Sequence, residues 1–278
     1  IFKKPLVDTV HIYFTDSDYL RIVKSQLAVK ILHKLTLRYF NFLYRQCDLL
    51  LAPSKLLVQE LKSNGFKKEV FYQPNGVVLR KPKLLSVKTK STLKKKYSLK
   101  EKVILHFGRL SYEKNVDLLI KSFHILTKHH TNVSLLIIGD GPAKKHLTKL
   151  VKKLGIEKDV IFTGFIDHQV LMSSSLLSIG DVFATASTME VNPMTVLEAM
   201  SYGLPIVGVS QAGLIELVSE NGFLVKPGDL KELSQKIEQI LSDEKLAEKM
   251  GKSSVELVQR YSIDKTTDQL LDFYRKLL

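Results

Sequence analysis

The sequence has little cysteine and no long apolar run. Its 278 residues include a single cysteine, Cys47, so an internal disulfide is excluded. A lone cysteine in apolar surroundings is typical of a small buried side chain in a reducing compartment, and we expect a cytoplasmic protein. The longest apolar runs, such as residues 135–138, are far shorter than the roughly 20 residues that span a bilayer. We therefore expect no transmembrane helix.

Acidic residues are also few relative to basic ones. The formal net charge of +14 creates a field that attracts nucleic acid, acidic lipid headgroups or nucleotide phosphates. The densest basic run, residues 81–102, has few aromatic residues among its lysines. Binding of nucleic acid by base stacking favours interleaved aromatic side chains, so we expect no nucleic-acid partner.

The second half of the sequence alternates short apolar runs with longer amphipathic segments. This alternation predicts a parallel sheet covered by helices, which is a complete doubly wound α/β lobe. The expected strands are residues 103–107, 134–138, 160–162, 182–184, 205–208 and 223–225. The expected helices are residues 116–130, 143–154, 169–177 and 193–202, followed by a helical tail.

The first part of the sequence predicts only a portion of a second α/β lobe. The expected strands are residues 7–12, 49–52 and 70–72, and the expected helices are residues 19–45 and 55–63. Pro74-Asn75-Gly76 combines a rigid residue with two that tolerate positive φ, which favours a hinge before the lysine-rich connector. We expect a partial N-terminal lobe at 1–77, a C-terminal lobe at 78–262, and a helix at 263–278 that returns to the N-terminal lobe.

The chain opens on Ile1 with neither an initiator methionine nor the pattern of a signal peptide. An N-terminal lobe of 77 residues is also below the roughly 100 residues usual for a domain. We expect a chain that begins inside a longer protein, with a truncated N-terminal lobe. Such a piece should bind its ligand better than it turns it over.

Parallel sheets bind ligands beyond the carboxyl ends of their strands, so the loops that follow the strands are the candidate sites. The loop after residues 103–107 contains Gly108, Arg109 and Lys114. Glycine permits close approach of a ligand to the backbone, and two cations can neutralise a diphosphate. The alternative is a pair of solvated surface cations.

The loop after residues 134–138 reads Gly139-Asp140-Gly141-Pro142. It matches the first two glycines of a dinucleotide-binding fingerprint, but Lys144 stands where the third belongs. No acidic residue ends the next strand. A dehydrogenase is therefore not favoured, and we interpret the segment as a tight turn before a helix.

The loop after residues 182–184 carries two carboxylates. Pro193 suits the start of a helix, so Glu190 should lie in the loop and Glu198 within the helix. The free N–H groups of a helix start attract phosphate, and carboxylates accept hydrogen bonds from sugar hydroxyls. The alternative to a ligand site is that Glu190 only stabilises the positive end of the helix dipole and that Glu198 is an ordinary solvated helix residue.

Together these residues resemble a known family. Glu190 and Glu198, followed by Ala199-Met200 and Gly203-Leu204-Pro205, resemble the E-x7-E motif of GT4-type retaining glycosyltransferases of GT-B fold. Other landmarks follow in the family's order, from about Thr9 to the C-terminus. The resemblance implies two Rossmann-like doubly wound lobes facing across a cleft. It implies a hexosyltransferase that uses a nucleotide-diphosphate sugar and requires no metal or other cofactor.

The resemblance also implies roles for individual residues. Arg109 and Lys114 should hold the donor diphosphate and Glu198 its ribose. Glu190 should lie near the hydroxyls of the transferred sugar. His11, in the N-terminal lobe, resembles a histidine that faces the reacting sugar, so His11 and Glu190 are the expected catalytic residues.

The remaining donor contacts follow from the same resemblance. The segment with Gly164 and Phe165 should lie near the base, with Gly108 and Gly139 in the adjoining loops. Pro193 departs from the family pattern because it has no N–H. We therefore expect the phosphate contacts to come from the N–H groups of Met194 and Thr195.

The acceptor is less defined by the sequence. Lys30, Lys34 and Arg38 recur at every fourth residue beside an apolar stripe, which indicates either a basic membrane-facing helix or a helix packed on its sheet. Residues 11–19 resemble the same stretch of bacterial diacylglycerol glucosyltransferases. We expect a lipid acceptor and a protein peripheral to the inner face of an anionic membrane.

Two alternatives to a lipid acceptor stay open. One is a hexosyltransferase that acts on soluble acceptors in polysaccharide or glycoconjugate synthesis, and the other is a non-catalytic basic protein that binds nucleotide sugars. Asp16-Ser17-Asp18 imitates the metal-binding D-x-D of a different glycosyltransferase fold. We interpret it as a chance match and expect no metal site.

Overall fold

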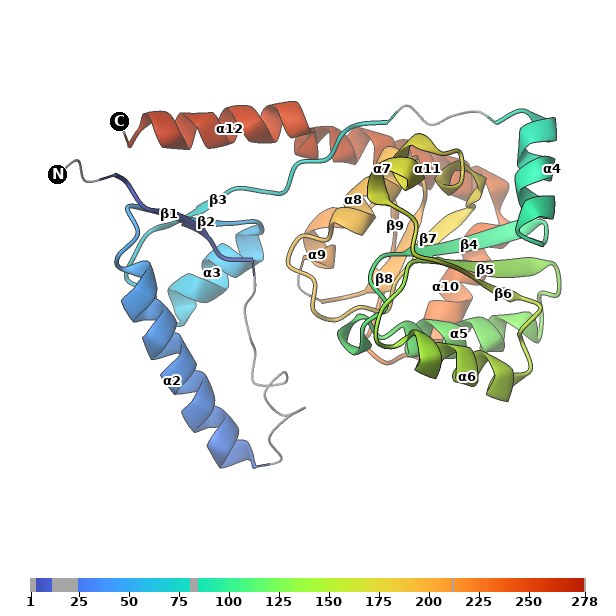
Figure 1. Cartoon of the computed structure of the whole chain (residues 1–278), viewed down its shortest axis with the longest axis horizontal. Helices are drawn as coiled ribbons and strands as arrows, with labels where there is room; N and C mark the ends of the chain where they lie inside the picture. Colours follow the sequence, from blue (N-terminus) through green and yellow to red (C-terminus); the bar gives the residue numbers. More distant parts are fainter. Residues whose placement is uncertain (1–3, 12–24, 81–84, 212, 278) are drawn as a thin grey trace. The chain divides into compact units, whose positions relative to one another are not determined.

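The structure is a computed structural model that describes residues 4–11, 25–80, 85–211 and 213–277 (Figure 1). The chain divides into two compact units. Unit 1 comprises Ile1–Gly76 together with Ile263–Leu278, and unit 2 comprises Val77–Ser262. The expected boundaries at residues 77 and 262 differ from this division by no more than one residue.

Unit 2 is built on a parallel sheet of six strands, with the order β6-β5-β4-β7-β8-β9. Its strands are β4 (Lys102–Phe107), β5 (Val133–Ile138), β6 (Val160–Gly164), β7 (Val182–Ala184), β8 (Ile206–Val209) and β9 (Gly222–Val225). The strand order reverses between β4 and β7, which makes this pair the topological switch point. The prediction of a doubly wound lobe is thereby confirmed, with each strand within two residues of its expected bounds.

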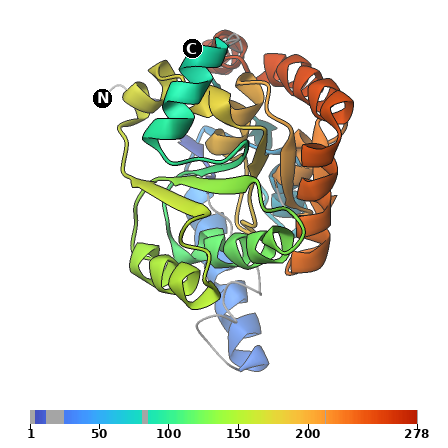
Figure 2. The same ribbon diagram turned by 90° about the vertical axis from the view of Figure 1, so that its right-hand side faces the viewer.

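Helices cover both faces of this sheet (Figures 1 and 2). One core contains Ile104 of β4 and Phe123, and the other contains Leu105 of β4 and Phe183. Successive side chains of a strand point to opposite faces, so both faces are apolar and the strands show no alternation of apolar and polar residues. The helices of the first core include α5 (Val116–Thr127), α6 (Lys144–Leu154) and α10 (Leu230–Ser242). Those of the second include α7 (His168–Ser173), α8 (Met194–Ser201) and the end of α11 (Glu244–Val258).

Part of the lysine-rich connector forms a helix, which the sequence analysis did not predict. Helix α4 (Val87–Lys96) begins after Ser86, whose side chain accepts a hydrogen bond from the N–H of Thr89 at 3.1 Å. None of its residues is buried. The sequence of this helix is mostly polar and has no apolar stripe, so it shows no helical periodicity of apolar residues. The start of the helix is set by the Ser86 cap.

Unit 1 is a smaller α/β layer. Strands β1 (Val7–Thr9), β2 (Leu49–Ala52) and β3 (Val70–Tyr72) form a parallel sheet in sequence order. Helices α2 (Gln26–Tyr44) and α3 (Lys55–Ser63) connect the strands, and Ser25 and Ser54 cap their starts. Strand β1 ends at Thr9, earlier than expected. The part of the expected helix before Ser25 lies outside the described residues.

Helix α12 (Ile263–Arg275) packs against β3 within unit 1. The side-chain amide of Gln269 donates to the carbonyl of Tyr72 at 2.5 Å, and the rings of Phe71 and Phe273 lie 5.3 Å apart. A Cβ atom on Gly76 would lie 2.2 Å from Thr266 Oγ1 of this helix. Asn75 and Gly76 do not adopt positive φ, so the expected reason for this glycine was wrong. Glycine is needed there because α12 approaches so closely.

In the part of the chain that the structure describes, no helix is both long and apolar enough to cross a bilayer.

Candidate functional site

Three glycine-containing loops meet at the carboxyl edge of the unit 2 sheet. The N–H of Gly108 donates to the carbonyl of Ile138, and the N–H of Gly139 donates to the carbonyl of Gly164, both at 3.0 Å. Gly139 has a φ of 139°, and a Cβ atom there would lie 2.0 Å from the Gly108 carbonyl oxygen. The loops after β4, β5 and β6 are therefore in backbone contact, which a side chain at position 139 would prevent.

The same loops lie against the start of α8. The Cβ position of Gly108 is 3.4 Å from Thr195 Cγ2 in the first turn of that helix. Pro193 precedes the helix and supplies no side-chain cap. The N–H groups of Met194 and Thr195 donate to no acceptor within the described ranges, so the helix start presents two unpaired donors.

The loops after β4 and β7 are joined by an ion pair that the sequence did not predict. Lys114 Nζ lies 2.7 Å from Glu190 Oε1, and both side chains are at least two-thirds buried. The side-chain amide of Asn115 donates to Thr188 Oγ1 at 3.1 Å, which adds a second link. The N–H of Gly213 donates to the carbonyl of Glu190 at 2.7 Å and fixes the loop backbone.

Arg109 differs from Lys114 in its surroundings. Its side chain is exposed and forms no hydrogen bond or ion pair with another described residue. The loop after β4 thus supplies one cation that is paired and one that is open to an anionic ligand.

Glu198 is buried within α8 and is held by a histidine. His168 Nε2 lies 2.7 Å from Glu198 Oε1, and the two side chains are 67% and 7% exposed, respectively. Burial raises the pKa of Glu198 above its ordinary value, and the hydrogen bond from His168 opposes that rise. The sequence analysis did not identify His168, because nothing in the local pattern relates it to a carboxylate 30 residues later.

A second histidine was also missed. His106, the fifth residue of β4, is buried, and its Nδ1 lies 2.9 Å from the carbonyl of Ala184 in β7. Burial lowers the pKa of His106 to about 4. The neutral ring therefore donates from Nδ1 and links the two strands of the switch point.

Phe165 and His11 are two further residues that the sequence analysis assigned to the site. Phe165 directly follows Gly164 and its ring is largely exposed. His11 belongs to unit 1, where it is exposed two residues after β1. The Asp16-Ser17-Asp18 segment lies outside the described residues. The other expected residues lie on the loops or strand ends at the carboxyl edge of the unit 2 sheet or in α8.

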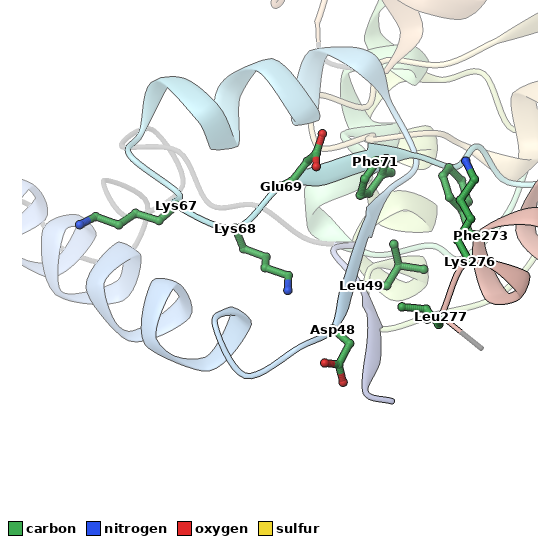
Figure 3. Close-up of a pocket in the computed structure, with 9 residues that line it drawn as sticks. All are labelled: Asp48, Leu49, Lys67, Lys68, Glu69, Phe71, Phe273, Lys276 and Leu277. Carbon is green, nitrogen blue, oxygen red and sulfur yellow. The ribbon is translucent and has the colours of Figure 1, made fainter. Parts of the chain in front are cut away.

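Unit 1 has a hollow of about 350 Å³ at a different position (Figure 3). It is lined by Asp48, Leu49, Lys67, Lys68, Glu69, Phe71, Phe273, Lys276 and Leu277. These residues surround the amino ends of β2 and β3, whereas parallel sheets bind ligands at the carboxyl ends. We assign it no part in ligand binding by the cluster above.

The chain is similar to known proteins in sequence and in structure. The family profile described as "Glycosyl transferases group 1" matches residues 88–256. The alpha-D-kanosaminyltransferase of Streptomyces kanamyceticus is 30% identical over 192 residues, which cover 68% of this chain and 49% of the relative. The alpha-monoglucosyldiacylglycerol synthase of Streptococcus pneumoniae is 29% identical over 225 residues, which cover 80% of this chain and 50% of the relative. The chain thus spans about half the length of the curated relatives it matches.

A solved structure agrees with these matches. The Anabaena protein Alr3699/HepE, crystallised with UDP, superposes with a TM-score of 0.82 at 24% identity, covering 98% of this chain and 72% of that one. The fold is GT-B, as the sequence predicted. Because the family profile covers more than half of the chain, the protein belongs to the group 1 glycosyl transferases.

Proposed function

We propose that this chain carries the donor site of a retaining hexosyltransferase, which takes its sugar from a nucleotide-diphosphate sugar. The observation that carries the proposal is the cluster at the switch point of the unit 2 sheet. There, an exposed Arg109, the Lys114–Glu190 pair and the unpaired N–H groups of Met194 and Thr195 gather beside the buried Glu198. The UDP bound to the Anabaena protein supports a nucleoside diphosphate as the ligand.

Each part of the donor has a chemically matched partner in this cluster. Arg109, Lys114 and the start of α8 present positive charge and N–H donors to the diphosphate. The Glu198 carboxylate accepts hydrogen bonds from ribose hydroxyls. Glu190 does the same for the hexose, and its ion pair with Lys114 ties the sugar position to the phosphate position.

These groups also suit the chemistry. Transfer breaks the bond between the hexose C1 and the diphosphate oxygen and forms one between C1 and an acceptor hydroxyl oxygen, whose proton passes to the departing diphosphate. Negative charge grows on the departing diphosphate, and preplaced cations and N–H groups stabilise it there. We propose that these groups perform this role without a metal, and that His11 is a catalytic residue that acts on the reacting sugar.

The proposed acceptor is a membrane lipid such as diacylglycerol, and its support comes from unit 1. Helix α2 has a single buried residue, Val29. Most of its exposed apolar side chains follow the helical repeat, namely Leu27, Ile31, Leu35, Tyr39 and Phe42, and Leu32 and Leu43 are exposed beside them. Lys30, Lys34 and Arg38 are exposed beside them. An apolar stripe flanked by cations binds anionic membrane surfaces, and the name of the streptococcal relative indicates a lipid acceptor.

A thermal-shift screen tests the donor site. UDP-, GDP- and ADP-sugars should be compared with and without EDTA, and one nucleotide should raise Tm by mass action. EDTA should leave that shift unchanged. If no nucleotide sugar stabilises the protein or binds by calorimetry, the donor proposal is rejected.

Flotation with liposomes tests the membrane surface. The protein should float with anionic vesicles at low salt, and much less with neutral vesicles or at ~0.5 M salt, where the Debye length is shortened. An Ile31→Glu, Leu35→Glu variant should lose binding, while Val87→Glu, on the exposed helix α4 of unit 2, should retain it. Equal flotation of all three proteins contradicts the role of α2.

Assays of the complete protein separate the alternatives. Transfer to diacylglycerol supports the proposed acceptor, and transfer to soluble saccharides alone supports the soluble-acceptor enzyme. Donor binding without transfer to any acceptor supports a non-catalytic nucleotide-sugar-binding protein.

A further inference from the structure

The two carboxylate oxygens of Glu198 differ in their contacts, and the proposed binding of the donor does not explain this difference. One carboxylate oxygen, Oε1, is engaged by His168 Nε2 at 2.7 Å. The other accepts no hydrogen bond from another described residue. The imidazole that holds the first oxygen is mostly exposed, and its Nδ1 is not bonded to any residue in the described ranges.

Other ionisable groups near Glu198 do not share this contact. Tyr202 lies at the end of α8, but its hydroxyl donates to the carbonyl of Met172, at 2.5 Å. Burial raises the pKa of Tyr202, the charge of Arg80 lowers it, and the charge of Glu198 raises it further. Glu198 and Tyr202 therefore interact electrostatically but share no hydrogen bond. Within the described part of unit 2, His168 is the ionisable group that holds the carboxylate.

We propose that His168 is a positioning residue for the donor, which orients Glu198 so that its second oxygen stays open to the ribose diol. The inference rests on the proposed function, because it assigns Glu198 to the ribose. Asp167 supports this placement, since its side chain accepts from the N–H groups of Gln169 and Val170 and fixes the start of α7 at His168.

The physical reason is the cost of a buried carboxylate. Burial favours the protonated form, which is a poorer acceptor for two ribose hydroxyls, and a donated hydrogen bond favours the ionised form. Donor affinity should therefore fall as pH decreases through the pKa of Glu198. Loss of the His168 hydrogen bond raises that pKa further, so the acidic limb of the binding profile should move to higher pH.

The test measures nucleotide affinity by calorimetry from pH 5 to 8 in four proteins. UDP is the probe, unless GDP or ADP stabilises the wild type more. The variants are His168→Phe, which removes the donor, and His168→Gln, which keeps an N–H without a titratable ring. The control is His129→Phe, an exposed histidine beyond the end of α5.

We expect His168→Phe to bind about tenfold more weakly near neutral pH, as for the loss of one hydrogen bond to a charged group. Its acidic limb should lie at higher pH than that of the wild type. His168→Gln should bind UDP with nearly the affinity of the wild type, and its acidic limb should lie close to the pH of the wild-type limb. His129→Phe should match the wild type throughout.

A deoxyribose probe distinguishes positioning from a general structural effect. The wild type should bind 2′-deoxy-UDP more weakly than UDP, whereas His168→Phe should discriminate less between them. Unchanged or tighter UDP binding by His168→Phe overturns the inference, and so does an unshifted acidic limb. If His168→Phe fails to fold, a His168→Gln variant with reduced affinity and the full discrimination of the wild type overturns it as well. A wild type that binds no nucleotide at any pH refutes the proposed function itself.

Discussion

Lys114 and Glu190 form the contact that joins the loops after β4 and β7. We expect Lys114→Met to weaken UDP binding about 10- to 100-fold, because it removes a hydrogen bond between charged groups worth ~1.5–3 kcal/mol. Affinity for uridine, which has no phosphate, should change little. Calorimetry with both ligands checks this.

Lys252→Met is the matched control for that prediction. Lys252 also pairs with a glutamate at 2.7 Å, Glu248, but on the exposed surface of α11. It should bind UDP as the wild type does. If the two lysine variants bind UDP equally well, Lys114 does not contact the diphosphate.

His106 makes fold stability depend on pH. Its pKa in the fold, about 4, lies below the ordinary 6.5, so the unfolded chain binds its proton more tightly. The contribution of neutral His106 to the free energy of unfolding is fully present above pH 6.5. It is lost as pH falls toward 4, by up to about 3 kcal/mol.

Urea unfolding between pH 7.5 and 4.5 measures this dependence. His106→Asn keeps a donor near the Ala184 carbonyl but cannot titrate, so its stability should fall less on acidification than that of the wild type. His129→Asn should follow the wild type. An equal fall for His106→Asn and the wild type shows that other groups cause the acid sensitivity.

At the scale of elements, the loops after β4, β5 and β6 are held together by backbone contacts that require a glycine at position 139. Gly139→Ala should lower the free energy of unfolding by more than the roughly 1–2 kcal/mol expected for a non-glycine residue with positive φ. The added Cβ would also clash with the Gly108 carbonyl. Gly155→Ala is the control, since Gly155 also has positive φ but has no atom within 4 Å of the added Cβ. Urea unfolding should show the larger loss for Gly139→Ala, and equal losses exclude the steric reason.

Helix α12 completes unit 1 through its contacts with β3. Phe273→Ala removes the ring that lies 5.3 Å from Phe71, and it should reduce hydrogen-exchange protection in α12 and β3. Protection in unit 2 and UDP affinity should stay unchanged. Tyr274→Ala, which changes a more exposed neighbour on the same helix, should have little effect. Loss of protection throughout unit 2 would contradict the division of the chain.

The elements themselves were largely predictable. Strands β2, β3 and β7 and helix α3 have the bounds that the sequence predicts, because short apolar runs and capping serines are local signals. Helix α4 was missed because it has no buried face. The reason for Gly76 was wrong because it depends on contact with α12, more than 180 residues later.

At the scale of the whole molecule, the two units place different chemistry in separate parts of the chain. All the proposed contacts to the donor's diphosphate and ribose lie in Val77–Ser262, while the basic apolar helix α2 lies in unit 1. Hydrogen exchange with saturating UDP should therefore protect the loops after β4 and β7 and the start of α8, and leave α2 unchanged. Protection of α2 by UDP alone would contradict the assignment of the diphosphate site to unit 2.

The sequence by itself determined the α/β class, the complete second lobe, the loops that carry Arg109 and Glu190, and the helix that carries Glu198. These follow from apolar periodicity and from the rule that parallel sheets bind ligands at their carboxyl edge. Only the tertiary structure decided that Lys114 pairs with Glu190 and His168 with Glu198. Each pair is far apart in sequence, by 76 and 30 residues, respectively. Contacts at such separations are set by the strand order and by the packing of α7 against α8, which no local pattern encodes.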